Sequence, residues 1–158
     1  MELSNDTLNE LPRNIIVPNY DRSALRAGII HVGVGNFHRA HQAWYLHRLM
    51  QVGEADDWAI IGAGVRDADA IMREKLLRQD CLTTLIELDP SSSSVEVIGS
   101  MIDYLPIEKN NKSLIQRIAR SDIRIVALTV TEGGYFINPA TKCFCLLYTS
   151  PSPRDRIA

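Results

Sequence analysis

The sequence lacks the features that would place it among secreted scaffolds, membrane proteins or nucleic-acid binders. It has only three cysteines, Cys81, Cys143 and Cys145, and their spacing matches neither a disulfide framework nor a zinc site. No run approaches the roughly 20 apolar residues of a membrane span, and the N-terminus has no signal-peptide stretch. The formal net charge of −2 comes with no basic patch that would attract nucleic acid or anionic lipid. We therefore expect a cytoplasmic protein that binds neither nucleic acid nor membrane.

The residues that are present have the periodicity of an α/β domain. Short apolar runs that stop at glycines or polar residues indicate buried strands, and helical spacing of apolar residues indicates helices between them. The expected strands are 28–33, 58–64 and 123–130, the expected helices 37–51, 67–78 and 111–120, and the expected hairpin strands 82–88 and 95–102, around a loop at Ser91–Ser94. Strands that alternate with helices predict a Rossmann-like, doubly wound, mostly parallel sheet. Residues 1–27 are expected to form an irregular leader that packs onto it.

A glycine-rich turn follows the first expected strand. In Gly33-Val34-Gly35-Asn36-Phe37-His38, the first glycine permits a tight turn and the second permits close approach of a pyrophosphate, which the following helix would stabilise. Asn36 is expected to cap that helix. His38 stands where the usual pattern has a third glycine. The segment predicts nucleotide binding, and the alternative is that these glycines only make a tight strand-to-helix connection.

An acidic residue after the second strand is the next element of such a site. Asp67 has this place in the topology, although it lies 29 residues after His38 rather than the usual distance of about 20. We expect Asp67 to contact the adenosine ribose, and the alternative is that it caps the helix that follows. Arg66 beside it is suited to a 2′-phosphate, so NADP remains an alternative to NAD.

Two motifs resemble the polyol-specific long-chain dehydrogenases, the mannitol dehydrogenase family. They are Gly33-Val34-Gly35-Asn36-Phe37-His38-Arg39-Ala40-His41 and Thr129-Val130-Thr131-Glu132-Gly133-Gly134-Tyr135. The resemblance implies NAD-dependent interconversion of a sugar alcohol and its ketose, of the mannitol and fructose type, or of a hexuronate and its keto form, without a metal. It resembles the mannitol 2-dehydrogenase branch more than the fructuronate reductase branch.

The same resemblance assigns cofactor-binding roles to residues of both motifs. It places Gly33, Val34, Gly35, Asn36, Phe37, His38 and Arg39 at the pyrophosphate turn, Asp67 at the ribose, and Thr131 and Glu132 near the nicotinamide. Arg39 is alternatively a solvated first-turn arginine, and Glu132 alternatively a loop carboxylate. We expect no metal at His38 and His41, because no third ligand follows at a suitable spacing. His47 falls on the apolar arc of its helix and is expected to be a core residue.

The resemblance also implies a second, largely helical domain that carries the substrate pocket and a catalytic lysine. No segment of this chain matches that motif, and Lys142 is not a substitute, so we expect no catalytic residue among these 158. We expect the dinucleotide-binding domain, 28–144, to be incomplete. Residues 145–158 resemble the translation of a sequencing adapter and are expected to be a non-native tail, the alternative being a genuine proline-rich tail.

Two other functions compete with the dehydrogenase. An S-adenosylmethionine-dependent methyltransferase also has a glycine-rich turn after its first strand, but usually an acidic residue just before the glycines, where this chain has His31-Val32. A non-catalytic nucleotide-binding module is the other alternative. The sequence does not identify the polyol or the oligomeric state.

Overall fold

Two parallel strands, buried on both faces, form the centre of the molecule. The computed structural model describes residues 2–90, 92–130 and 141. Strands β2 (Ala27–Val32) and β3 (Ala59–Ala63) pair in parallel, with Ile30 opposite Ile61. All but one of their residues are buried. A strand covered on both faces needs apolar side chains at successive positions rather than at every second one, which explains the unbroken apolar runs.

The main sheet is wholly parallel, with the strand order β6-β3-β2-β7. Its outer strands are β6 (Met101–Tyr104) and β7 (Ile125–Leu128). The chain moves from β2 to β3 and β6 on one side, and later returns to place β7 on the other side of β2. The strand order therefore reverses at β2, as it does in doubly wound folds at the point where ligands bind.

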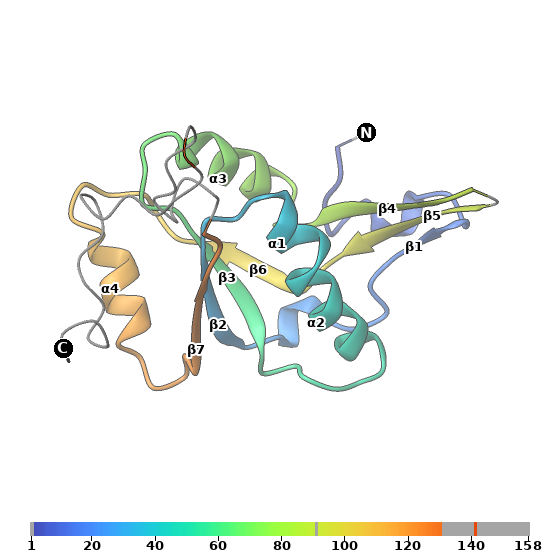
Figure 1. Ribbon diagram of the computed structural model, residues 1–158. Coiled ribbons are helices and arrows are strands. Elements are labelled where there is room, and N and C mark those ends of the chain that lie inside the picture. Colours follow the sequence, from blue (N-terminus) through green and yellow to red (C-terminus); the bar gives the residue numbers. More distant parts are fainter. Residues whose placement is uncertain (1, 91, 131–140, 142–158) are drawn as a thin grey trace.

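Helices cover both faces of this sheet (Figure 1). They are α1 (Asn36–Ala40), α2 (Gln42–Gln51), α3 (Asp69–Arg78) and α4 (Lys112–Ile118). On one face Leu114 of α4 joins a buried cluster with Ile30 and Ile61. On the other face the neighbouring strand residues Ile29 and Ile60 pack with side chains of α2 and α3. The predicted doubly wound α/β fold is thereby confirmed.

The expected helix over 37–51 is in fact two helices. The break falls at His41, whose backbone angles (φ −121°, ψ −80°) are not helical. Gly35, in an extended conformation, occupies the N-cap position of α1, so the prediction that Asn36 caps the helix is wrong. Asn36 lies in the first turn instead, where its side-chain oxygen accepts a hydrogen bond from Arg39.

Because of the break at His41, the buried and exposed side chains of the first helical turn are the opposite of those in a continuous helix over 37–51. His38 is only 1% exposed and Phe37 is 66% exposed, whereas a continuous helix would bury Phe37 and leave His38 in solvent. In α2, by contrast, Ala43, His47 and Met50 are buried. His47 is therefore a core residue as expected.

Strands β4 (Thr83–Asp89) and β5 (Ser92–Ile98) form the expected antiparallel hairpin, but it belongs to a second sheet. A two-residue strand, β1 (Ile15–Ile16), pairs in parallel with β5, and this three-stranded arm projects away from the main sheet (Figure 1). The interpretation of Ser92–Ser94 as part of a loop is wrong, since these residues continue the ladder opposite Glu87–Asp89, while Ser91 lies outside the described residues. The expected strand over 95–102 is also divided, because β6 leaves the hairpin and joins the main sheet.

The leader is more ordered than expected. Besides β1, it contains two short 3-10 helices, η1 (Leu8–Glu10) and η2 (Arg22–Ala24). The guanidinium of Arg22 donates hydrogen bonds to the carbonyls of Gly99 (2.9 Å), Met101 (2.8 Å) and Asp80 (2.7 Å). One side chain therefore fixes the leader to the end of α3 and to the segment between the two sheets.

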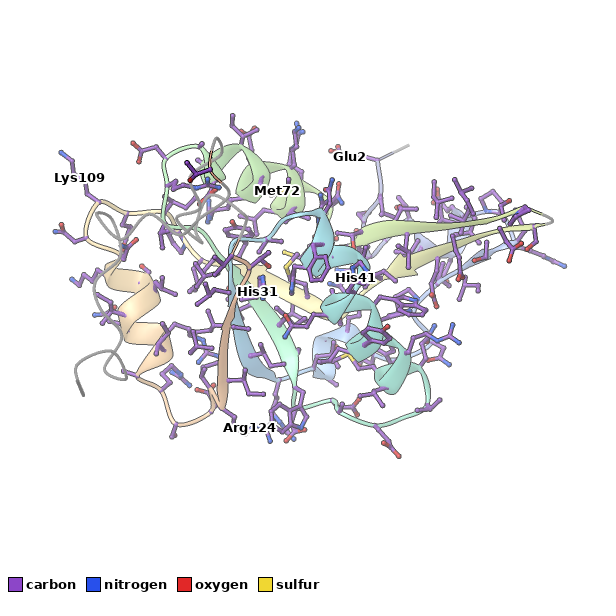
Figure 2. The ribbon with its side chains drawn as sticks, viewed as in Figure 1. Glu2, His31, His41, Met72, Lys109 and Arg124 are labelled. Carbon is purple, nitrogen blue, oxygen red and sulfur yellow. The ribbon has the colours of Figure 1, made fainter. Side chains whose placement is uncertain are left out.

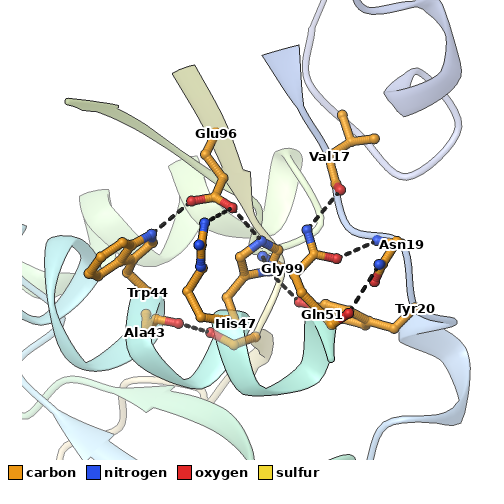
Figure 3. A network of polar contacts seen from close by, with 11 residues as sticks. Val17, Asn19, Tyr20, Ala43, Trp44, His47, Gln51, Glu96 and Gly99 are labelled. Atoms are coloured by element: carbon orange, nitrogen blue, oxygen red, sulfur yellow. Dashed lines mark hydrogen bonds and ion pairs between the residues drawn. The ribbon is translucent and has the colours of Figure 1, made fainter. Parts of the chain in front are cut away.

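A buried polar network joins the leader, α2 and β5 (Figure 3). The Tyr20 hydroxyl lies 2.6 Å from Nδ1 of His47, which also accepts from the Gly99 N–H at 3.3 Å. The other ring nitrogen of His47 faces the buried Glu96 at 3.4 Å, and the Trp44 indole donates to that carboxylate at 2.7 Å. Burial lowers the pKa of His47 although Glu96 opposes this shift, so the ring is neutral near pH 7.

Strand β7 differs from the expectation of a buried core strand. Ile125, Val126 and Leu128 are between 44% and 62% exposed, and no described strand pairs with the outer edge of β7. Apolar periodicity predicts that a strand is present but not how many neighbours it has. Among the described residues, no helix combines the length and the apolar character needed to cross a bilayer.

Candidate functional site: the glycine turn and its two cavities

The turn after β2 depends on Gly33. This residue has φ +85°, in the left-handed region where a side chain is strained, and its N–H donates to the Ala63 carbonyl of β3 at 2.9 Å. The Gly35 N–H in turn donates to the Gly33 carbonyl at 2.8 Å. The turn is thus fixed to the end of the neighbouring strand. The predicted succession of strand, glycine turn and helix is also present.

A cavity of about 520 Å³, which we call the turn cavity, opens on the β3 side of this turn. Its lining comes from the ends of β2, β3, β6 and β7 and the start of α3: Val32, Gly33, Val34, Gly35, Val65, Arg66, Ala68, Asp69, Met72, Tyr104, Leu128 and Thr129. A Cβ placed on Gly35 would have no neighbour closer than 4.0 Å. The space beside Gly35 is therefore not filled by the protein, and a diphosphate can approach the backbone there.

The carboxylate that lines the turn cavity is Asp69 and not Asp67. Oδ2 of Asp69 accepts the N–H groups of Val65 and Arg66, both at 3.1 Å, and Oδ1 accepts from the Arg66 guanidinium at 2.9 Å. A Cβ at Gly64 would lie 2.4 Å from the Cβ of Asp69, so glycine at the end of β3 is what allows Asp69 to fold back over the strand. This steric requirement at Gly64 is the signal that sequence reasoning missed.

Asp67 is exposed and is absent from the lining of the turn cavity. Its backbone carbonyl accepts from Ala70, and Ala68 occupies the N-cap position of α3, so Asp67 does not cap that helix. Partial burial raises the pKa of Asp69, but the hydrogen bonds from the Arg66 side chain and from two backbone N–H groups outweigh it and hold the pKa below its ordinary value. Asp69 is therefore an anion at neutral pH.

A second cavity, of about 410 Å³, lies on the β7 side of the turn, and we call it the histidine cavity. It is lined by His31, Phe37, His38, Gln42, Ala127, Leu128, Thr129 and Val130. Leu128 and Thr129 also line the turn cavity, so the two cavities meet at the end of β7. Together they flank the point where the strand order reverses.

Two buried imidazole rings are stacked beside the histidine cavity. The rings of His31 and His38 have centroids 3.6 Å apart and planes inclined by 17°. Nε2 of His31 lies 3.0 Å from the Thr129 hydroxyl, and Nδ1 of His38 lies 3.0 Å from Oε1 of Gln42. Burial lowers the pKa of His31 and lowers that of His38 to about 4, so both rings are neutral near pH 7. The expected continuous helix over 37–51 would turn His38 toward solvent, so it gave no sign of this pair.

The remaining predicted residues have separate surroundings. Asn36 and Arg39 line another, smaller cavity of about 160 Å³ against β4, which is separate from the turn cavity and the histidine cavity. His41 is exposed and stacks on Phe37 with centroids 4.4 Å apart, so it does not converge with His38. Figure 2 labels His31 and His41 on different sides of α1. Thr131 and Glu132 lie outside the described residues, although β7 and Val130 lead to them.

Comparison with known proteins supports this organisation. The model of the mannitol dehydrogenase Rossmann domain matches residues 27–156, which is most of the chain. The chain belongs to the mannitol dehydrogenase family. Within this family, the mannitol 2-dehydrogenase of Cereibacter sphaeroides is 55% identical over 128 residues, which cover 81% of this chain and 27% of that protein.

Two solved structures have the same fold. The mannitol 2-dehydrogenase of Pseudomonas fluorescens, in a ternary complex with NAD and D-mannitol, matches with a TM-score of 0.82 and 46% identity, over 91% of this chain and 30% of that one. A substrate-free D-sorbitol dehydrogenase matches with a TM-score of 0.77 and 41% identity, over 93% and 30%. The chain thus spans less than a third of the length of these relatives.

Proposed function

We propose that this chain is the dinucleotide-binding part of an NAD-dependent polyol dehydrogenase. The observation that carries this proposal is the structural match, at 46% identity, to an enzyme whose complex contains NAD and D-mannitol. The methyltransferase alternative is set aside because the chain belongs to the mannitol dehydrogenase family. We also propose that the protein acts in the cytoplasm on a small polyol or keto sugar.

In this proposal the turn cavity receives the adenosine diphosphate half of the cofactor. The backbone at Gly33 and Gly35 would face the pyrophosphate, and Asp69 would accept a hydrogen bond from the ribose diol. Oδ1 of Asp69 has the Arg66 guanidinium as its partner, and a carboxylate oxygen has room for a second donor. Since α1 has only five residues, backbone N–H groups contribute more to phosphate binding than the dipole of so short a helix.

The nicotinamide end of the proposed cofactor site includes residues 131 and 132. Thr131 and Glu132 come three and four positions after Leu128, the last residue of β7, and parallel α/β sheets bind ligands beyond the carboxyl ends of their strands. We place both near the nicotinamide. Asp67, exposed beside the cavity, is at most a peripheral contact of the ribose.

The proposed reaction moves a hydride between the sugar-alcohol carbon and the nicotinamide, which supplies the redox chemistry when bound. The alcohol also exchanges a hydroxyl proton, which requires a general base. We assign this base to none of the described residues, because His31 and His38 are buried and Asp69 already accepts hydrogen bonds from Arg66 and two backbone N–H groups. We assign the substrate pocket and the base to other parts of a longer polypeptide, because the relatives are about three times as long.

Arg66 leaves NADP as the alternative cofactor. Its side chain is 77% exposed beside Asp69, where a 2′-phosphate would lie, and a relative from Gluconobacter oxydans that is 41% identical is a polyol:NADP oxidoreductase. The mannitol and fructose pair is our first choice of substrate, and a hexuronate is the second.

The test is titration of the whole chain with NADH, followed by cofactor fluorescence, with the variant Gly35→Val. A valine at this position meets no protein atom closer than 4.0 Å from its Cβ, yet its side chain extends into the turn cavity. We expect saturable NADH binding by the parent chain, a loss of at least tenfold in the variant, and unchanged circular dichroism. A folded parent chain that binds neither NADH nor ADP-ribose would refute the proposal.

A further inference from the structure

Arg39 is a half-buried cation for which the described residues supply no carboxylate. Its Nε donates to the Gly35 carbonyl at 3.4 Å, one terminal nitrogen donates to Oδ1 of Asn36, and it forms no ion pair with a described residue. A guanidinium has five N–H donors, so three of them are left without an acceptor in this part of the protein. Charged groups that are withdrawn from water are usually paired with an opposite charge, and the surroundings of Arg39 therefore suit an anion.

The small cavity beside Arg39, which we call the arginine cavity, presents hydrogen-bond donors. Its described lining residues include no carboxylate: they are Asn36, Arg39, Ala40, Thr83, Thr84 and Leu85. Because a guanidinium only donates, Asn36 turns its carbonyl oxygen to Arg39, and its amide NH2 stays available. The exposed Thr84 adds a hydroxyl that can donate as well. All of these donors are side-chain groups, so they do not depend on the end of the short helix α1.

The charges on the neighbouring elements leave the arginine cavity positive. No acidic residue occurs from residue 36 to residue 53, the stretch that contains α1 and α2. The nearest acidic residue within β4 is Glu87, two positions beyond the lining residue Leu85. Glu96, which is paired with Leu85 across the hairpin, accepts a hydrogen bond from the Trp44 indole instead. An anion in this cavity would therefore meet Arg39 before it meets any of these carboxylates.

The volume of the arginine cavity, about 160 Å³, limits the size of its ligand. Pockets for drug-sized molecules usually measure about 300–1,000 Å³, whereas one water molecule takes about 30 Å³ in the liquid. The cavity is therefore suited to a single tetrahedral oxyanion and not to a dinucleotide. None of its described lining residues belongs to the turn cavity or the histidine cavity.

We propose that Arg39, Asn36 and Thr84 form a binding site for a phosphate-type oxyanion, either inorganic phosphate or the phosphate group of a small sugar ester. The planar guanidinium donates to two oxygens of the anion, and the amide and the hydroxyl donate to the others. This site is separate from the proposed cofactor site, and it gives Arg39 a ligand other than the cofactor pyrophosphate to which its sequence motif assigns it. Through the contact of Arg39 with Gly35, a bound oxyanion also restrains the first turn of α1.

The test is a titration of the whole chain with inorganic phosphate at constant ionic strength, followed by the backbone amide signals in NMR. We expect saturable shifts at residues 36–40 and 83–85, with a dissociation constant on the order of 1 mM, as suits a few charge-assisted hydrogen bonds at a partly exposed site. Arg39→Gln keeps a hydrogen-bond donor but removes the charge, and it should weaken binding at least tenfold. Thr84→Asp places a carboxylate at the exposed side of the cavity and should have the same effect, even if Arg39→Gln fails to fold.

The matched control is Arg48→Gln, which removes the other arginine of the α1–α2 stretch. Arg48 is 56% exposed and lies outside the lining of the arginine cavity, so this variant should bind phosphate within twofold of the parent chain. A hexose 6-phosphate, with the unphosphorylated hexose as its control, distinguishes the two sources of the oxyanion. Tighter binding of the ester than of inorganic phosphate assigns the site to a sugar phosphate, and equal or weaker binding assigns it to inorganic phosphate.

Four results would overturn the inference. They are a parent chain without saturable shifts, shifts confined to Val65 and Arg66 of the turn cavity, phosphate binding that survives in a folded Arg39→Gln or Thr84→Asp variant, and an equal loss in Arg48→Gln. The last result would mean that phosphate responds only to the general positive charge of this stretch.

Discussion

The two cavities beside the glycine turn are adjacent but use opposite electrostatics. The turn cavity presents an ion pair, Arg66 with Asp69, in which the guanidinium is largely solvated. The histidine cavity presents two buried, neutral imidazole rings. A solvated charge pair attracts hydroxyl and phosphate groups at a modest cost of desolvation, whereas neutral buried rings impose shape and a fixed hydrogen-bonding direction. A single glycine turn therefore separates a cavity with an exposed ion pair from a cavity lined by neutral, buried rings.

The largest expected effect is a pH dependence of stability between pH 7 and pH 4, which arises from the histidine cavity and not from the turn cavity. The pKa of His38 falls from its ordinary 6.5 to about 4 on burial, so the unfolded chain binds a proton between these values and the folded chain does not. The stabilisation is complete above pH 6.5 and is lost as the pH falls to about 4, a contribution of roughly 3 kcal/mol. His31 and His47 shift in the same direction. Asp69, whose pKa is lowered, begins to lose its contribution only at more acidic pH.

Urea denaturation between pH 7 and pH 4 measures this difference. We expect a steep loss of unfolding free energy over this range in the parent chain and a shallower loss in His38→Phe. The exposed His41→Phe should keep the parent slope. A parent chain whose stability is flat from pH 7 to pH 4 would contradict the assignment of buried, neutral histidines.

The second expected effect is a loss of NADH affinity when the carboxylate of the turn cavity is removed. Asp69→Ala removes the acceptor of two backbone N–H groups and of Arg66, so we expect NADH affinity to fall by about tenfold or more. Asp67→Ala is the matched control, two residues away and outside the lining, and should change the affinity by less than twofold. Calorimetric titration of both variants decides which carboxylate faces the ribose; a larger effect at Asp67 would reverse our placement.

The third expected effect is a difference in unfolding free energy between alanine substitutions at the two glycines of the turn. Gly33→Ala places a side chain at φ +85° and should cost about 1–2 kcal/mol of unfolding free energy. Gly35→Ala should change stability by only a few tenths, since the Cβ at Gly35 meets open space. Guanidinium denaturation of the two variants tests this. Equal destabilisation would mean that Gly35 is also held in a strained backbone.

The smallest effect concerns cofactor choice. Arg66→Ala should weaken NADPH by roughly three- to tenfold relative to NADH, because it removes the cation nearest to the proposed 2′-phosphate. The ratio of the two dissociation constants, measured at low salt and again at high salt, is the readout. A ratio unchanged at low salt would exclude Arg66 from phosphate binding.

The sequence alone was sufficient for the framework of this site but not for its side chains. The glycines, the strand before them and the parallel sheet follow from local conformational preference and apolar runs, and these were predicted. The predicted orientations of Asn36, Phe37 and His38 assumed one continuous helix. The break at His41 shows that this assumption is wrong. No local preference marks that break.

The carboxylate of the turn cavity shows the same limit. Asp67 and Asp69 are equivalent in residue type and two positions apart, and only the contact of Asp69 with Gly64 distinguishes them. The serines of β5 were assigned to a loop because a serine run beside Asp89-Pro90 is typical of a turn, yet Ser92–Ser94 pair with Glu87–Asp89. In both cases the deciding contact joins residues only three to seven positions apart, and residue type alone does not reveal it.

The outer edge of β7 has a consequence for handling the protein. Its exposed isoleucine, valine and leucine side chains accompany a backbone edge that no described strand covers. Such an edge is a template for adding another strand, from this polypeptide or from a neighbouring molecule. In a concentrated sample, this edge is therefore a place where self-association can begin.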